Sequence, residues 1–182
     1  MDLVDLIAEK RFLGQEFLTW LWWKSEERGG SVALPEEGDA TVVFEKHMLL
    51  EFGEGESSEK IICTGLQAEL QEARTGLQMG KKLEQARITI SYNSYEFSFT
   101  LAAALMEFRS VRLPKTEGTE GDSGDNPEEV EGMILERIFL FEVLIRVVNL
   151  LFQMFLQVRV GDKWPAELAK VTAWIHKATV AL

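Results

Sequence analysis

The segments Ala86-Arg-Ile-Thr-Ile-Ser-Tyr92 and Tyr95-Glu-Phe-Ser-Phe-Thr-Leu101 alternate apolar and polar side chains, and Asn93-Ser94 joins them. A period of two is typical of a β-strand that buries one face. Asn93-Ser94 is a turn dipeptide, because asparagine tolerates positive φ angles. The stretch therefore predicts an antiparallel β-hairpin with one apolar face.

Shorter apolar runs on both sides of this hairpin predict further strands. Upstream, residues 41–44 and 48–52 flank Glu45-Lys46-His47, which we expect to form a tight hairpin turn. Residues 60–64 predict a third strand, and residues 105–113 predict one more after the main hairpin. The sheet that we expect is small, antiparallel and built of hairpins.

The N-terminal segment 2–28 has the composition of a helix and ends at Gly29-Gly30, a strong stop signal. Its apolar side chains cover most of the helix circumference, which indicates burial between two layers or against a second subunit. Its three tryptophans are core residues in one interpretation and anchors of a subunit interface in the other: Trp20, Trp22 and Trp23.

Helical spacing returns in residues 65–80 and in the last third of the chain. Asn126-Pro127 suits the start of a long helix over 127–160, which Gly161-Asp162 ends. One narrow polar stripe runs along this otherwise apolar helix, through Glu142, Arg146, Asn149, Gln153 and Gln157. Charges interrupt the segment throughout, so we expect a deeply packed helix and not a membrane span.

A last helix is expected from Pro165 onward. The expected fold class is α+β, with a small antiparallel sheet, an N-terminal tryptophan-rich helix and two C-terminal helices. At 182 residues the chain suits a single domain over 1–182. We expect a disordered acidic linker at 115–127, before the C-terminal helical pair, because this segment has no apolar side chain to bury.

The net charge of −11 argues against indiscriminate binding to nucleic acid or to an anionic membrane. Residues 116–131 hold seven acids and no base, however, and removing these seven acids from −11 leaves only −4. The single cysteine, Cys63, fits a reducing cytoplasm, and the acidic N-terminus does not resemble a secretion signal. We therefore expect a cytoplasmic protein whose folded part is mildly acidic.

The sequence predicts no catalytic residue, metal site, cofactor or small-molecule substrate. The two histidines, His47 and His176, lie 129 residues apart, and no nucleophile or orienting partner is recognisable for either. A nuclease would require a metal-binding carboxylate cluster, which the linear sequence does not reveal.

Basic residues near the main hairpin are candidates for contacts with nucleic-acid phosphates. If the strands pair as expected, one edge of the sheet gathers Lys81, Lys82, Arg87, Arg109 and Arg112. Solvated edge charges that suppress aggregation explain the same residues equally well.

The segment Phe12-Leu-Gly-Gln-Glu-Phe-Leu-Thr-Trp-Leu-Trp-Trp23 resembles the RdgC family of recombination-associated proteins. The resemblance continues more loosely through residues 82–90, 95–101 and 110–114. It implies a non-enzymatic, ring-forming dimer that encloses duplex DNA and restrains recombinase loading, although members are sometimes labelled exonucleases. This chain is shorter than the usual member and is acidic, and no catalytic residue carries over to it.

Two hypotheses follow. The first is a non-enzymatic RdgC-like protein that contacts duplex DNA independently of sequence, in recombination or its regulation. The second is a protein-interaction or self-association module without a nucleic-acid role, which uses the tryptophan-rich helix and the long C-terminal helix. The apolar helices favour a homo-oligomer, although in the second hypothesis the partner is either another protein or a second copy, and we expect no membrane contact.

Overall fold

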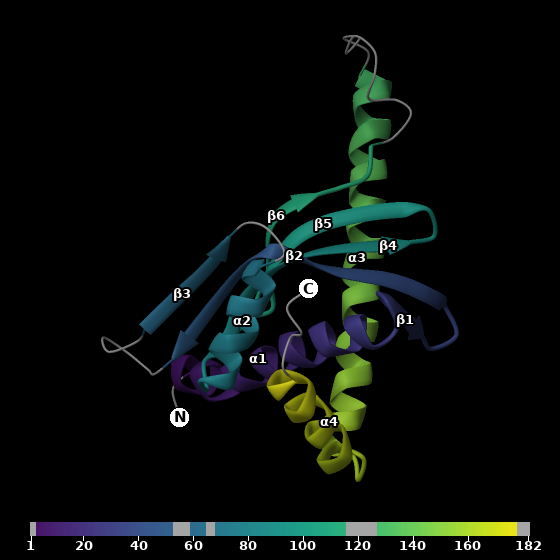
Figure 1. Ribbon diagram of the computed structural model, residues 1–182. Coiled ribbons are helices and arrows are strands. Elements are labelled where there is room, and N and C mark those ends of the chain that lie inside the picture. Colours follow the sequence, from purple (N-terminus) through teal and green to yellow (C-terminus); the bar gives the residue numbers. More distant parts are fainter. Residues whose placement is uncertain (1–2, 53–58, 65–67, 116–126, 178–182) are drawn as a thin grey trace.

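A computed structural model of the protein describes residues 3–52, 59–64, 68–115 and 127–177 (Figure 1). The expected α+β class is confirmed. In chain order the elements are α1 (Leu3–Glu27), β1 (Ser31–Leu34), β2 (Gly38–Phe52), β3 (Glu59–Thr64), α2 (Ala68–Gln78), β4 (Lys82–Tyr92), β5 (Tyr95–Ala102), β6 (Glu107–Arg112), α3 (Pro127–Val160) and α4 (Trp164–His176). The predicted acidic linker lies, apart from its two ends, outside the described residues.

The strands form one antiparallel sheet in the order β1-β2-β4-β5-β6, and β3 pairs with the second half of β2. The predicted central hairpin is confirmed, since β4 pairs with β5 from Gln85 opposite Ala102 to Tyr92 opposite Tyr95. Its turn residues Asn93 and Ser94 have φ angles of 48° and 68°, as a tight turn between twisted strands requires.

The tight turn expected at Glu45-Lys46-His47 is wrong, because these residues lie inside the single long strand β2. The pairing of β2 with β4 shifts register between Phe44 and Met48, so the polar residues occupy an irregularity in the strand. Sequence reasoning also missed β1, whose four residues pair with the first residues of β2. A short strand gives too little alternation to be recognised.

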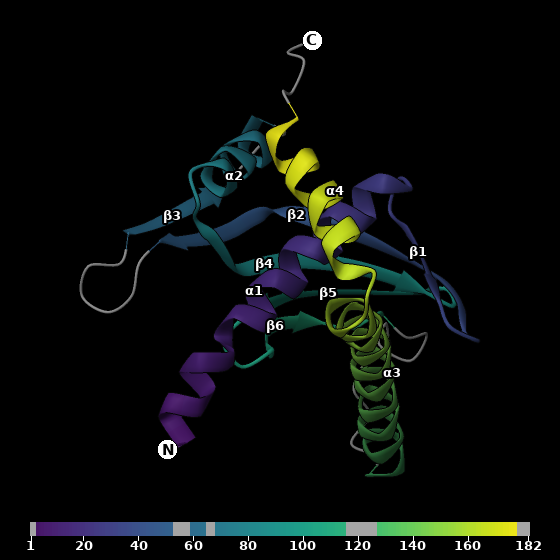
Figure 2. The same ribbon diagram turned by 90° about the horizontal axis from the view of Figure 1, so that it is seen from below.

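The helices α1 to α4 all lie on one face of the sheet, in front of it in Figure 2. The second half of α1 is buried between two layers, which is one of the two alternatives that the sequence left open. Trp22 stacks on Phe44 of β2 and meets Trp174 of α4 edge-on, with ring centroids 6.0 and 5.0 Å away. Closer to the N-terminus of α1 than Trp22, Phe17 contacts Phe155 of α3. One hydrophobic core therefore joins the sheet, α1 and the C-terminal helices.

Only the part of α3 from Leu140 onward contributes fully buried side chains to this core. The preceding turns extend past the β6 edge of the sheet (Figure 1). The segment Val130–Arg159 is long and apolar enough to cross a membrane, although 39% of its most apolar window is buried inside the protein. The expected deeply packed helix is thus confirmed from Leu140 onward and is wrong for residues 130–139, which are exposed. This apolar part beyond the sheet needs a separate explanation.

A polar cluster attaches α1 to the end of the sheet where β4 begins. Arg11 of α1 donates hydrogen bonds to Glu51 of β2 and to Glu84 of β4, and Gln15 donates to Glu84 at 2.9 Å. Burial lowers the pKa of Arg11, but the hydrogen bonds and charges of Glu84 and Glu51 outweigh burial and raise this pKa overall. Arg11 therefore balances two carboxylates that the fold largely removes from water.

Close to this cluster, Gly14 allows α1 to touch the end of β5. A Cβ atom at Gly14 would lie 2.0 Å from the carbonyl oxygen of Ala103, which is backbone and cannot move aside as a side chain would. We predict that Gly14→Ala lowers the free energy of unfolding by about 3 kcal/mol, because α1 must shift away from the sheet.

The matched control is Gly132→Ala in α3, where nothing lies within 4 Å of the added Cβ atom. This change should stabilise the protein by roughly 0.5–1 kcal/mol through helix propensity. Urea unfolding followed by circular dichroism measures the free energy of unfolding of both variants and of the wild type. A Gly14→Ala protein as stable as the wild type would contradict the close contact.

Candidate functional site

The face of the sheet opposite the helices carries polar side chains, and no helix of the described residues covers it. We call it the open face; it comprises Thr41, Val43, Glu45, Arg87, Thr89, Ser91, Glu96, Ser98, Thr100, Arg109 and Arg112. Residues paired across antiparallel strands point to the same face, which is why these side chains from four strands gather there.

Three of the five predicted nucleic-acid-binding residues meet on the open face. Arg87 pairs with Thr100, and Thr100 pairs with Arg109, so the two arginines lie in one row across β4, β5 and β6. Arg112 lies in the next row, opposite Ser98. Strand pairing thus brings together basic residues that are more than twenty positions apart in sequence.

The other two predicted residues do not join them. Lys81 is 6% exposed, and its Nζ lies 3.1 Å from a carboxylate oxygen of Glu59. Lys82 pairs with Glu51 at the start of β4, five residues or about 17 Å of extended strand from Arg87. The expectation that all five gather at one edge is therefore wrong, because Lys81 and Lys82 lie where β4 begins, whereas Arg87 lies in its middle, beside β5 and β6.

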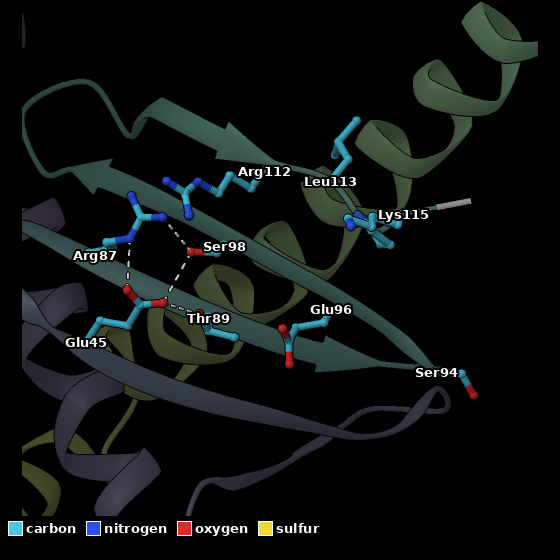
Figure 3. Close-up of a pocket in the computed structure, with 10 residues that line it drawn as sticks. Glu45, Arg87, Thr89, Ser94, Glu96, Ser98, Arg112, Leu113 and Lys115 are labelled. Atoms are coloured by element: carbon cyan, nitrogen blue, oxygen red, sulfur yellow. Dashed lines mark hydrogen bonds and ion pairs between the residues drawn. The ribbon is translucent and has the colours of Figure 1, made fainter. Parts of the chain in front are cut away.

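The open face has a hollow of about 560 Å³ that extends from Arg87 toward Ser94 and Lys115, and we call it the arginine hollow (Figure 3). Glu45 lies on one side of it and accepts hydrogen bonds from Arg87 (Nε at 2.8 Å), from Ser98 (3.2 Å) and from Thr89. Burial raises the pKa of Glu45, but the hydrogen bonds of Thr89, Ser98 and Arg87 outweigh it and lower this pKa overall. The carboxylate is therefore ionised and fully used by its neighbours.

Two other cations of the arginine hollow have no such neighbour. Within the described part of the chain, the side chains of Arg112 and Lys115 form neither an ion pair nor a hydrogen bond. Arg109, outside the hollow, differs from them because its guanidinium lies 2.6 Å from Glu107. The hollow thus combines one neutralised arginine with two cations that face solvent.

The second candidate surface is the start of α3. Seven large apolar side chains between residues 130 and 141 are at least 36% exposed, and we call this region the protruding segment: Val130, Met133, Ile134, Leu135, Ile138, Phe139 and Phe141. The polar stripe of α3 is exposed from Glu142 to Gln157. On the same side of the helix before Glu142, however, the exposed side chains are apolar: Leu135, Ile138 and Phe139.

The three tryptophans of α1 are not part of either surface. Trp20, Trp22 and Trp23 are at most 5% exposed. Trp20 also donates to Glu167 of α4, with its Nε1 3.4 Å from the acceptor. Of the two interpretations that the sequence left open, the tryptophans are therefore core residues and not anchors of a subunit interface.

The carboxylates of the described residues do not form a metal centre. No group of three or more histidine, cysteine, aspartate or glutamate side chains in the described ranges is arranged to hold a metal ion. Glu51 and Glu84 lie together but share Arg11.

Comparisons of the chain with protein-family models, curated proteins and solved structures find no match. The resemblance to the RdgC family therefore stays a prediction.

The lowered pKa of Glu45 predicts a pH-dependent contribution to stability. A carboxylate whose pKa is lower in the folded than in the unfolded state stabilises above the unfolded value, about 4.3, and loses this effect as pH falls through the folded value. We predict that Glu45→Gln destabilises the protein by up to about 1 kcal/mol at pH 7, and that this difference disappears toward pH 3. Urea unfolding of both proteins at each pH measures it. A difference independent of pH would contradict the ionised Glu45 network.

Proposed function

We propose that this chain is a non-enzymatic binding protein that pairs with a second copy of itself through the protruding segment of α3. The observation that supports this proposal is the change along the solvent side of α3, where Glu142, Arg146 and Asn149 are preceded by Leu135, Ile138 and Phe139. A helix that remains in water keeps polar residues on its outer side. The protruding segment departs from this pattern just where the sheet ends.

The size of the apolar patch fits a dimer. Seven side chains exposed to about one half present on the order of 600 Å² of apolar surface, which is as large as the largest patches on typical monomers. Complete burial of this surface in both copies would remove about 1,200 Å² from water, the lower limit of a standard specific interface, so about 1,200 Å² is the most that these side chains contribute. Single apolar residues scattered over a protein surface do not form a continuous patch of this size.

Charges at the ends of the apolar stripe favour an antiparallel arrangement. Glu131 precedes the stripe, and Arg146 follows it on the same side of the helix. In an antiparallel pair with its two-fold axis between Ile138 and Phe139, Glu131 of each copy faces Arg146 of the other. A parallel pair would instead place each Glu131 beside its equivalent.

We predict that the double variant Leu135→Glu, Ile138→Glu remains monomeric at concentrations where the wild type dimerises, because it places four buried charges in the interface. Both side chains are more than half exposed, so the fold should survive, as circular dichroism will show. The matched control is Val160→Glu, at the opposite end of α3 and 82% exposed, which should dimerise like the wild type.

Sedimentation velocity at several concentrations measures the oligomeric state of the wild type, the double variant and the control. A wild type that stays monomeric at about 100 μM would overturn the proposal. Exchanging the charges tests the arrangement: Glu131→Arg or Arg146→Glu alone should weaken dimerisation, and the two together should restore it.

A second candidate function is sequence-independent contact with the phosphates of duplex DNA, as the RdgC resemblance implies. It is supported by the position of Arg87, Arg109 and Arg112 on one face that no described helix covers. Arginine contacts to phosphates fix position without reading base sequence. A role in recombination and a cytoplasmic location stay predictions that accompany this candidate.

Gel-shift titration of duplex DNA at several salt concentrations tests it. With three arginine–phosphate contacts, the logarithm of the binding constant should fall with the logarithm of salt concentration with a slope of about −2.7. Arg109→Gln should reduce the slope by about 0.9, whereas Lys82→Gln, at the far end of β4, should leave it unchanged. No binding at micromolar protein and low salt would exclude this candidate.

A further inference from the structure

The arginine hollow contains more cationic hydrogen-bond donors than its own side chains use. The guanidinium of Arg87 has five N–H donors, and its contacts in the hollow are the Nε bond to Glu45 and an Nη bond of 2.9 Å to Ser98. The guanidinium of Arg112 extends over Ser98 toward Arg87 (Figure 3), and none of its donors is used within the described residues.

The charge of the hollow is also unbalanced. Three cations line it, Arg87, Arg112 and Lys115, and they exceed the carboxylates, Glu45 and Glu96, by one. Glu45 is occupied by Arg87 and two hydroxyl groups, so its charge is largely compensated. Glu96 is exposed and lies away from the guanidiniums in Figure 3. The fold thus holds Arg112 beside Arg87 without a second carboxylate between them.

We propose that the arginine hollow binds a phosphate group between Arg87 and Arg112, with Lys115 as a third cation. Planar guanidiniums match the oxygen spacing of phosphate and bind it through paired, charge-assisted hydrogen bonds. Ordering of Arg87 by Glu45 reduces the entropy lost on binding. The volume of about 560 Å³ leaves room for a sugar or nucleotide attached to the phosphate.

This inference deepens the nucleic-acid candidate by naming the position of one phosphate, but it requires neither duplex DNA nor dimerisation. A backbone phosphate of nucleic acid and a terminal phosphate of a small molecule or strand end have the same chemistry. The experiment is therefore designed to separate these two sources.

Binding of pyrophosphate to the full chain is measured by isothermal titration. Binding of a short single-stranded oligonucleotide, with and without a 5′-phosphate, is measured by fluorescence anisotropy. We expect Arg112→Gln to weaken each interaction by at least tenfold, the effect of about 1.5 kcal/mol for a lost charge-assisted bond. Glu96→Gln should strengthen each interaction, because it removes a like charge from the hollow. Arg109→Gln, on the same face but outside the hollow, should leave pyrophosphate binding unchanged.

If removing the 5′-phosphate abolishes oligonucleotide binding, the hollow takes a terminal phosphate; if binding persists and still depends on Arg112, it takes a backbone phosphate. The proposal is overturned if pyrophosphate does not bind at millimolar concentration, or if Arg112→Gln binds like the wild type. Duplex binding that depends on Arg109 but not on Arg112 would refute the hollow and leave the DNA candidate intact.

Discussion

The apolar helix α1 must be covered on both sides, and the rest of the fold is arranged around this requirement. Trp22 contacts the sheet through Phe44 and the C-terminal helices through Trp174, so one side chain joins both layers. Large aromatic side chains each remove about 150–250 Å² from water, and this helix supplies Phe17, Trp20, Trp22 and Trp23 to the core. The absence of a side chain at Gly14 then allows α1 to approach the sheet closely.

Covering α1 places all the described helices on one face of the sheet, and this leaves the opposite face to water. A strand with one wet face alternates apolar and polar residues, so threonine, serine and arginine side chains collect on the open face. There Glu45 connects Arg87, Thr89 and Ser98 into a single network. The arginine hollow is therefore a consequence of the one-sided packing of the helices, and its free cations are the feature that packing does not explain.

The length of α3 explains the second surface. Its 34 residues span about 50 Å, whereas the path from β1 to β6 is only about 20 Å wide. A helix that crosses this sheet must extend beyond it, and α3 does so at the β6 edge. Polar residues would suffice to keep the extension in water. Leu135, Ile138 and Phe139 instead make it a surface that gains free energy when a second copy covers it.

Local patterns were enough to predict the central hairpin, the N-terminal helix and both C-terminal helices, because alternation, helical spacing and stop signals act between neighbours in the chain. They left open whether the N-terminal helix is buried between two layers or against a second subunit. They failed at Glu45, where a polar tripeptide that resembles a turn lies inside a strand and is held there by Arg87, forty-two positions away. They also failed to separate Lys82 from Arg87, which lie about 17 Å apart along the same strand, and to show that Lys81 is buried beside Glu59. The sequence thus contained the elements and the polarity of each face. Long-range pairing decided which polar side chains share the arginine hollow, and the limited width of the sheet decided which part of α3 remains uncovered.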